Sequence, residues 1–365
     1  MVNSYYLYLL EMTEVQKVIT RLKDTRRLDA RQYRQLLVAD SPADSRLLQS
    51  QARSASLSRF GNRIFIRGLI EISNHCRNNC LYCGIRAGNT ALRRYRLSKE
   101  EIMECCARGY ALGFRTFVLQ GGEDAAFSVG VLESLVRGIK ASWPDCAVTL
   151  SLGEMSEDSY RTLRAAGADR YLLRHETFNP EHYASLHPAD MSRDGRLECI
   201  AALQRLGYQT GTGIMVGSPR QTLDNIVEDL LYIQELKPQM IGIGPFIHHR
   251  DTPFRDMPDG SVDMTVRLIS IFRLMNPGAL IPATTALVTL DPEGRKKGIL
   301  AGANVVMPNL SPASRRRDYS LYEGKASGGA EAAEGLEELR RELQSIGYDI
   351  VTDRGDFCGA GTFEN

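Results

Sequence analysis

Short apolar runs alternate with amphipathic stretches along most of the chain, beginning near residue 62. The apolar runs occupy residues 64–72, 116–119, 147–150, 170–173, 209–216, 240–243, 279–282 and 304–307. The stretches between them, such as 98–112 and 222–236, space their apolar residues as one face of a helix does. Eight strand candidates alternating with helix candidates predict a parallel sheet with helical crossovers. Their number, over about 250 residues, favours an α/β fold of the complete (βα)8 TIM-barrel type over an open doubly wound sheet.

The two ends of the chain have a different pattern. Residues 1–58 are predicted to form an N-terminal helical extension, because leucine pairs recur among polar residues and Asp40-Ser41-Pro42 is typical of a helix start. The barrel is predicted to span residues 59–322. Residues 323–365 are predicted to form a C-terminal helical cap, because residues 328–347 are rich in Ala, Glu and Leu.

Composition narrows the class of protein. The 365 residues carry 45 Lys and Arg against 44 Asp and Glu, a formal net charge of +1. This balance offers no positive field for non-specific nucleic-acid binding. No apolar run approaches the roughly 20 residues of a membrane span. The eight cysteines are too sparse for a secreted disulfide scaffold. We therefore expect a cytoplasmic enzyme with a small-molecule substrate and neither a nucleic-acid nor a membrane partner.

Three cysteines follow the first predicted strand directly. Cys76, Cys80 and Cys83 give the pattern C-x3-C-x2-C. Three thiolates on one loop can hold three irons of a 4Fe–4S cluster and leave the fourth iron open. A structural zinc site with His75 as fourth ligand is an alternative, although adjacent ligands are awkward and no second C-x2-C pair is present. A redox-active Cys80–Cys83 dithiol is another, but it gives Cys76 no role.

Polar residues also follow two later strand candidates, where a barrel places its chemistry. Gly121-Gly122-Glu123 ends the second candidate, and two glycines allow a ligand to approach the backbone closely. Arg174 and Glu176 follow the fourth candidate. The two side chains could simply neutralise each other as a partly buried pair. A role in binding is favoured for Glu176, because a carboxylate at a strand end stabilises a barrel poorly.

The C-x3-C-x-Tyr-C spacing, with Tyr82 before the last cysteine, together with Gly-Gly-Glu, resembles the radical S-adenosylmethionine superfamily. Within that superfamily the chain is similar to the HydE family of iron–iron hydrogenase maturases, from about residue 15 to residue 325. The matching motifs lie at residues 76–84, 93–96, 118–124, 171–177, 215–219, 242–247, 282–286 and 303–309. Biotin synthase and methylornithine synthase resemble the chain more loosely.

The resemblance implies that the three cysteines hold one 4Fe–4S cluster, whose open iron binds the amino and carboxylate groups of S-adenosylmethionine. An electron from the cluster then cleaves the sulfonium to give a 5′-deoxyadenosyl radical. The residues that the resemblance assigns to cofactor binding are Tyr82, Gly121, Gly122, Glu123, Arg174, Glu176, Arg196 and Met307. Two members have simpler interpretations: Arg196 as a solvated residue in the first turn of a helix, and Met307 as a core residue.

Substrate residues come from the same resemblance. Thr284 and Thr285, after the seventh predicted strand, would anchor a small anionic group, although β-branched residues also pack well in strands. Tyr319 would donate its phenol from the loop after the last strand. Glu176 and Tyr319 are therefore the predicted catalytic residues.

The implied reaction is assembly of the dithiolate bridge of the hydrogenase H-cluster from a small cysteine-derived, iron-bound substrate. The implied partners are a low-potential electron donor and other hydrogenase maturases. Many members of the family bind a second cluster through three cysteines after the stretch that matches residues 319–325. Residues 326–330 contain no cysteine here, so a single cluster is expected.

The alternative functions are a radical mutase or sulfur-inserting enzyme of the methylornithine or biotin type, and a non-catalytic zinc-binding protein.

The remaining cysteines carry no predicted chemistry. Cys105, Cys106, Cys146 and Cys199 are interpreted as small core hydrophobes. Cys358, near the C-terminus, has no partner at ligand spacing.

Overall fold

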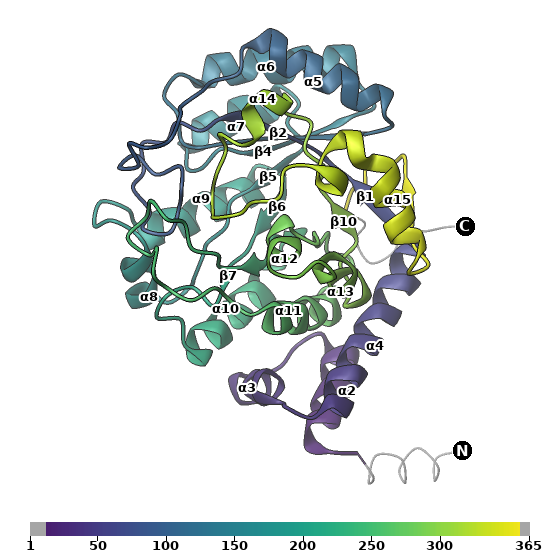
Figure 1. Ribbon diagram of the computed structural model, residues 1–365. Helices are drawn as coiled ribbons and strands as arrows, with labels where there is room; N and C mark the ends of the chain where they lie inside the picture. The colour runs from purple at the N-terminus through teal and green to yellow at the C-terminus, as the bar shows by residue number, and fades with distance from the viewer. Residues whose placement is uncertain (1–11, 358–365) are drawn as a thin grey trace.

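A ring of parallel strands surrounded by helices forms the centre of the molecule (Figure 1). The computed structural model describes residues 12–357, so that Cys358 lies outside the described range. Six strands pair continuously in chain order: β2 (Gly68–Ser73), β3 (Thr116–Gly121), β4 (Ala147–Ser151), β5 (Arg170–Leu172), β6 (Gln209–Thr212) and β8 (Met240–Ile241). Each of them falls within or next to one of the first six predicted runs.

The rest of the ring is linked by isolated bridges. Met240 pairs with Leu280, Pro282 with Val305, and Asn309 with Leu69 of β2. Backbone hydrogen bonds support these links, including one of 3.1 Å from Ile241 to Leu280 and one of 2.7 Å from Leu310 to Leu69. The α/β barrel prediction is confirmed, but the seventh run contributes bridges rather than a strand. Pro282 explains part of this, because it has no N–H to donate.

The lower half of the barrel has a strand order of its own. The strand β1 (Arg63–Ile66) leads into β2 and pairs with β10 (Val305–Val306) on one side and β11 (Asp349–Val351) on the other. The pattern of apolar runs did not predict β11. Two further short strands, β7 (Met215–Val216) and β9 (Gly244–Pro245), pair with each other after β6 and β8.

Helices cover the outside of the ring (Figure 1). They are α5 (Lys99–Ala111), α6 (Val129–Ser142), α7 (Glu157–Ala165), α8 (Pro180–Leu186), α9 (Arg193–Arg205), α10 (Leu223–Leu236), α11 (Val262–Met275), α12 (Thr285–Leu290), α13 (Gly294–Leu300) and α14 (Ala313–Arg316). Polar side chains cap the starts of α5 to α11. In α5, Ser98 accepts from the backbone N–H of Glu101, whose side chain accepts in return from Ser98. Buried apolar faces, such as Leu132, Leu135 and Ile139 of α6, pack toward the strands.

From residue 12 onward, three helices precede the barrel: α2 (Glu14–Thr25), α3 (Ala30–Val38) and α4 (Pro42–Phe60). They form a separate layer against the outer helices (Figure 1). Tyr33 of α3 is fully buried there, and its hydroxyl donates to Gln234 of α10 over 2.6 Å. None of the helices between residues 12 and 357 is long and apolar enough to cross a bilayer.

The C-terminal segment returns to the barrel as mixed structure. Two short 3-10 turns, η1 (Gly329–Glu331) and η2 (Ala333–Gly335), precede α15 (Leu336–Gln344), and β11 follows. The helix α15 packs against β11 and the two 3-10 turns. The predicted helical stretch of residues 328–347 is therefore helical only in its second half. Gly329 explains this, because its φ of +55° is incompatible with a continuous right-handed helix.

Residues after β11 close the floor of the barrel around a buried arginine. The side chain of Arg170 is fully buried and donates to Asp356 over 2.6 Å and to Thr116 over 2.9 Å. Gln209 also donates to Asp356, over 2.7 Å. Burial would raise the pKa of Asp356, but the positive charges of Arg170 and Arg354, with hydrogen bonds from Arg354 and Gln209, outweigh it and hold that pKa at about 2. The tail thus neutralises a charge inside the barrel.

Replacing Asp356→Asn should lower the free energy of unfolding at pH 7 by about 2–3 kcal/mol, because Arg170 loses its buried counter-charge. The difference from the wild type should be complete above the unfolded carboxyl pKa of about 4 and should vanish as the pH falls to about 2. Unfolding in urea, monitored by circular dichroism, measures this difference in the free energy of unfolding.

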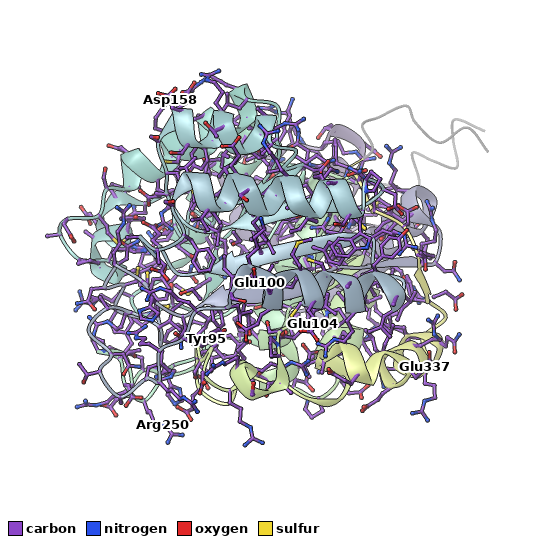
Figure 2. The ribbon with its side chains drawn as sticks, turned by 90° about the horizontal axis from the view of Figure 1, so that it is seen from above. Tyr95, Glu100, Glu104, Asp158, Arg250 and Glu337 are labelled. Atoms are coloured by element: carbon purple, nitrogen blue, oxygen red, sulfur yellow. The ribbon has the colours of Figure 1, made fainter. Side chains whose placement is uncertain are left out.

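Glu337→Gln is the matched control, since this exposed carboxylate on α15 (Figure 2) should change stability by less than about 0.5 kcal/mol. Equal stability of Asp356→Asn and the control would contradict the proposed role of the tail.

Candidate active site

The three cysteines lie on the long connection between β2 and α5. Cys76, Cys80 and Cys83 are free thiols and are partly buried. Backbone hydrogen bonds fix the connection at several points. The N–H of Arg77 donates to Glu123 after β3 over 2.9 Å, and the N–H of Gly84 donates to Leu321 over 2.8 Å. The loop is therefore tied both to the barrel and to the C-terminal segment.

One arginine holds the loop together from within. Arg94 donates to the backbone carbonyls of Ile85 over 2.8 Å, of Arg86 over 2.6 Å and of Asn89 over 3.0 Å, and it also donates to that of Asn74. Inward-facing carbonyls need hydrogen-bond donors when no helix or sheet supplies them. Arg94 donates to four such carbonyls, so it fixes the loop that carries the cysteines.

The cysteine thiols share one electrostatic environment. Burial raises the pKa of Cys80 to about 12, with smaller opposing and reinforcing effects of Arg196 and Cys76. Burial also raises the pKa of Cys83 and of Cys76. The thiols also act on one another: Cys76 raises the pKa of Cys80, and both of these cysteines raise the pKa of Cys83. As free groups they are neutral thiols, and binding of a metal would release their protons.

The loop geometry bears on the zinc alternative. A zinc ion needs four ligands at about 2.0–2.3 Å from one point. Within residues 12–357 no group of three or more His, Cys, Asp or Glu side chains is arranged to hold a single ion. In an iron–sulfur cube each thiolate binds a different iron, so the three sulfurs need not meet at one point. The cube therefore places a weaker demand on the positions of the three sulfurs than a zinc ion does.

The Gly-Gly-Glu segment lies directly against the cysteine loop. A Cβ on Gly122 would lie 2.2 Å from the carbonyl oxygen of His75 and 2.6 Å from Cβ of Cys76, so only glycine fits. The carboxylate of Glu123 accepts from Arg77 over 2.9 Å and from the backbone N–H of Glu154 over 2.9 Å. Gly121 completes the end of β3. These residues form the wall next to Cys76.

Tyr82 is partly buried. Its hydroxyl lies 3.3 Å from Nε2 of His187, and the two rings meet edge to face. Its ring packs against an apolar cluster that includes Met215, Phe246 and Phe254. Tyr82 thus links the cysteine loop to His187 and to this cluster.

Glu176 is the most strained of the predicted residues. Its φ of +65° places it in the left-handed region that non-glycine residues rarely adopt. Arg174 lies 2.9 Å from its Oε2, yet this ion pair lacks hydrogen-bond geometry, and Glu176 Oε2 and Arg174 Nε and Nη2 are buried without hydrogen-bond partners. Strain together with unsatisfied buried atoms is typical of a ligand site.

Arg196 is buried rather than solvated. Its guanidinium donates to Glu154 over 2.8 Å and to the backbone carbonyl of Arg174 over 3.1 Å. Burial opposes its charge, but the surrounding Tyr82, Tyr183 and carboxylates raise the pKa of Arg196 overall. The structure therefore brings the guanidinium of Arg196 to Glu154 and to the backbone of Arg174, and its positive charge acts to lower the pKa of Tyr82 and of Cys80. The simpler interpretation as a solvated helix residue does not hold.

The predicted substrate residues differ in their surroundings. Thr284 Oγ1 is buried without a hydrogen-bond partner, whereas Thr285 Oγ1 already donates to Glu331. The hydroxyl of Tyr319 accepts from Gln120 over 3.3 Å. Met307 packs against the cluster of Met240, Leu280 and Val305 in the lower barrel. The roles of these four residues stay predictions.

A buried ion pair inside the barrel was missed from the sequence. Glu71 of β2 is fully buried and pairs with the ammonium of Lys325, and Asn309 donates to the second carboxylate oxygen over 2.9 Å. Lys325 also lies 4.9 Å from the ring centroid of Tyr319 and donates to its carbonyl over 3.2 Å. A carboxylate in an otherwise apolar strand was the available signal.

Comparison with known proteins identifies the site. Residues 70–233 match the family model of the radical SAM superfamily. The [FeFe] hydrogenase maturase subunit HydE of Thermotoga maritima is 47% identical over 265 residues, which cover 73% of this chain and 75% of that protein. This chain belongs to the HydE family of the radical SAM superfamily. It is an enzyme of that superfamily, as the resemblance implied.

Two other enzymes resemble this HydE family member. A 3-methylornithine synthase of Methanosarcina barkeri is 30% identical over 86% of this chain and 85% of its own length. The crystal structure of methylornithine synthase (PylB) superimposes with a TM-score of 0.80 and 27% identity, over 92% of this chain and 97% of that one. The barrel is therefore shared across a group of related enzymes.

Family membership implies a 4Fe–4S cluster and S-adenosylmethionine at this site. The residues present fit both groups. The three thiols lie together on one loop, and Gly122 keeps the space beside Cys76 free of a side chain. The unsatisfied atoms of Glu176 and Arg174 provide an acceptor and donors for a charged, polar ligand.

Gly122→Ala should displace the cysteine loop, because the new Cβ would overlap the carbonyl of His75 and Cβ of Cys76. We expect a loss of about 1–3 kcal/mol in stability and clearly less iron and sulfide per chain after anaerobic reconstitution. Elemental analysis measures the second effect. Gly130→Ala on α6, where a Cβ meets no atom within 4 Å, is the matched control. Normal iron content in Gly122→Ala would show that the close approach is dispensable.

Proposed function

We propose that this enzyme reductively cleaves S-adenosylmethionine to a 5′-deoxyadenosyl radical during assembly of the iron–iron hydrogenase H-cluster. The radical would act on a small cysteine-derived, iron-bound substrate that becomes the dithiolate bridge. The observation that carries the proposal is the 47% identity to the HydE maturase of Thermotoga maritima. The arrangement of cysteines, Gly122 and Glu176 supports it.

Cys76, Cys80 and Cys83 would hold a single 4Fe–4S cluster. Such a cluster supplies one electron and an open coordination position for the amino and carboxylate groups of S-adenosylmethionine. The stretch after Lys325, residues 326–330, offers no thiol for a second cluster. One cluster per chain is therefore part of the proposal.

The chain's own residues would bind and orient the sulfonium cofactor. Backbone groups at Gly121 and Gly122, with Glu123, would accept from its ammonium group. Arg196 is already charged and held by Glu154, so it is oriented to meet a carboxylate without reorganising. Glu176 would accept from the ribose hydroxyls with its unsatisfied Oε2.

The interior of the barrel would receive the substrate. Thr284 offers an unsatisfied hydroxyl, and Tyr319 is held by Gln120 and Lys325 near the barrel mouth. The segment that carries Tyr319 contacts the cysteine loop through the Gly84–Leu321 hydrogen bond and the barrel interior through Lys325. This segment would exclude water, which a primary carbon radical requires.

The Cys80→Ser variant tests the cleavage step. It should abolish 5′-deoxyadenosine formation under dithionite, while circular dichroism shows an unchanged fold, because one of three iron ligands is lost. Chromatography of anaerobic reactions measures the nucleoside. Cys105→Ser, a buried cysteine of α5 away from the loop, is the control and should retain the activity. Cleavage by Cys80→Ser at the wild-type rate would refute the assignment.

Glu176→Ala tests cofactor binding separately. The dissociation constant for S-adenosylmethionine should rise about tenfold or more, the effect of losing a hydrogen bond to a charged group. Anaerobic calorimetry with the cluster-loaded enzyme measures it. Glu198→Ala, an exposed carboxylate on α9, should leave the constant unchanged. An unchanged constant for Glu176→Ala would remove this residue from the site.

The substrate assignment needs its own experiment. Incubating the loaded enzyme anaerobically with a cysteine-derived iron complex, and identifying the product by mass spectrometry, tests the maturase proposal. Conversion of an amino acid to a rearranged isomer, or insertion of sulfur into it, would instead identify a mutase or sulfur-inserting enzyme.

A further inference from the structure

The cysteine loop carries a charge pattern that the proposed function does not use. Between Ile72 and Ser98 the chain contains five arginines and no Asp or Glu, although the whole protein has a net charge of only +1. Two of the five, Arg86 and Arg94, donate to loop carbonyls and are structural. The other three, Arg77, Arg93 and Arg96, project to the surface.

Each of these three arginines has a carboxylate partner that is more deeply buried than the arginine itself. The side chain of Arg77 is 70% exposed and that of Glu123 9%, while those of Arg96 and Asp124 are 45% and 3% exposed. The acids therefore hold the arginines in place but do not face the solvent. The surface that the loop presents is positive.

A fourth exposed arginine joins this face from the C-terminal side. Arg93 lies 3.9 Å from Asp318, which places the end of α14 next to it, and Arg315 of α14 stacks over Tyr95 at 5.7 Å. Arg317, in the same segment, is exposed. Figure 2 labels Tyr95, and Glu100 on the following helix α5. We call Arg77, Arg93, Arg96 and Arg317 the arginine rim.

Two residues of the arginine rim lie at a surface hollow that reaches one cysteine. The hollow, of about 290 Å³, is lined by Cys76, Arg77, Arg94 and Arg96, and also by Glu123 and Asp124, the partners of Arg77 and Arg96. Of the three cysteines of the loop, Cys76 is the one that lines this hollow. An electron from a partner protein has the shortest path where the partner's redox group comes closest to the iron–sulfur group at the cysteines. The hollow allows such a close approach.

We propose that the arginine rim is the docking surface for a small, acidic, one-electron carrier protein. The inference rests on the proposed function, since only a redox-active loop needs such a partner. The carrier loses one electron, the iron–sulfur group held by the three cysteines gains it, and no bond is made or broken. Charge complementarity of this kind steers association and weakens as salt rises.

The test compares two double variants of the full-length, cluster-loaded enzyme. Arg93→Gln/Arg317→Gln removes two charges from the rim, at positions outside the cofactor-binding residues. Arg21→Gln/Lys23→Gln removes two exposed charges from α2, which lies away from the loop (Figure 1). The probe is a purified acidic flavodoxin, and the readout is its dissociation constant by anaerobic biolayer interferometry at low and high salt.

The rim variant should bind flavodoxin about tenfold more weakly than wild type at low salt, and the difference should shrink at high salt. The α2 variant should bind as wild type. Dithionite, which needs no docking surface, should support equal nucleoside formation in all three proteins. Wild-type affinity of the rim variant, or an equal loss in the α2 variant, would overturn the proposal. Failure of wild type to cleave S-adenosylmethionine with dithionite would instead refute the proposed function, while the binding result would stand.

Discussion

The site depends on satisfying the backbone of a long irregular loop at the mouth of a barrel. Residues 74–98 form neither helix nor strand, so their inward-facing carbonyls have no ladder of donors. The guanidinium of Arg94 supplies donors to four of them and thereby holds the three cysteines in one conformation. The close contact of Gly122 with Cys76, and that of Glu123 with Arg77, are possible only because the loop is fixed in this way.

Much of the architecture could be predicted from the sequence, because local signals and global fold agree. The first six apolar runs became the six continuous strands, and the Ser98 capping box begins α5 as expected. The cysteine spacing was informative for a different reason: iron–sulfur ligands must follow one another closely on one loop, so their pattern survives in the sequence. The family comparison confirms the interpretation that this pattern suggested.

Features that depend on distant parts of the chain could not be predicted. The strand β11 is three residues long and pairs with β1, nearly 300 residues earlier in the chain. The Glu71–Lys325 pair joins two residues that are separated by the whole barrel, and neither gives a signal for the other. The burial of Arg196 was also hidden, because the first turn of a helix does not reveal which way a long side chain turns. Each of these three features is determined by packing between segments of the chain.

The uneven closure of the barrel has a mechanical consequence. From β2 to β8 the wall is a continuous ladder, whereas the arc from β8 back to β2 depends on isolated bridges. Each link in that arc carries its own backbone hydrogen bonds, such as those from Leu280 to Gln239 and from Ala283 to Val305. The cysteine loop is anchored through β2 and β3, which belong to the continuous part. A change that breaks one link of the arc should therefore leave the strands that anchor the cysteine loop paired.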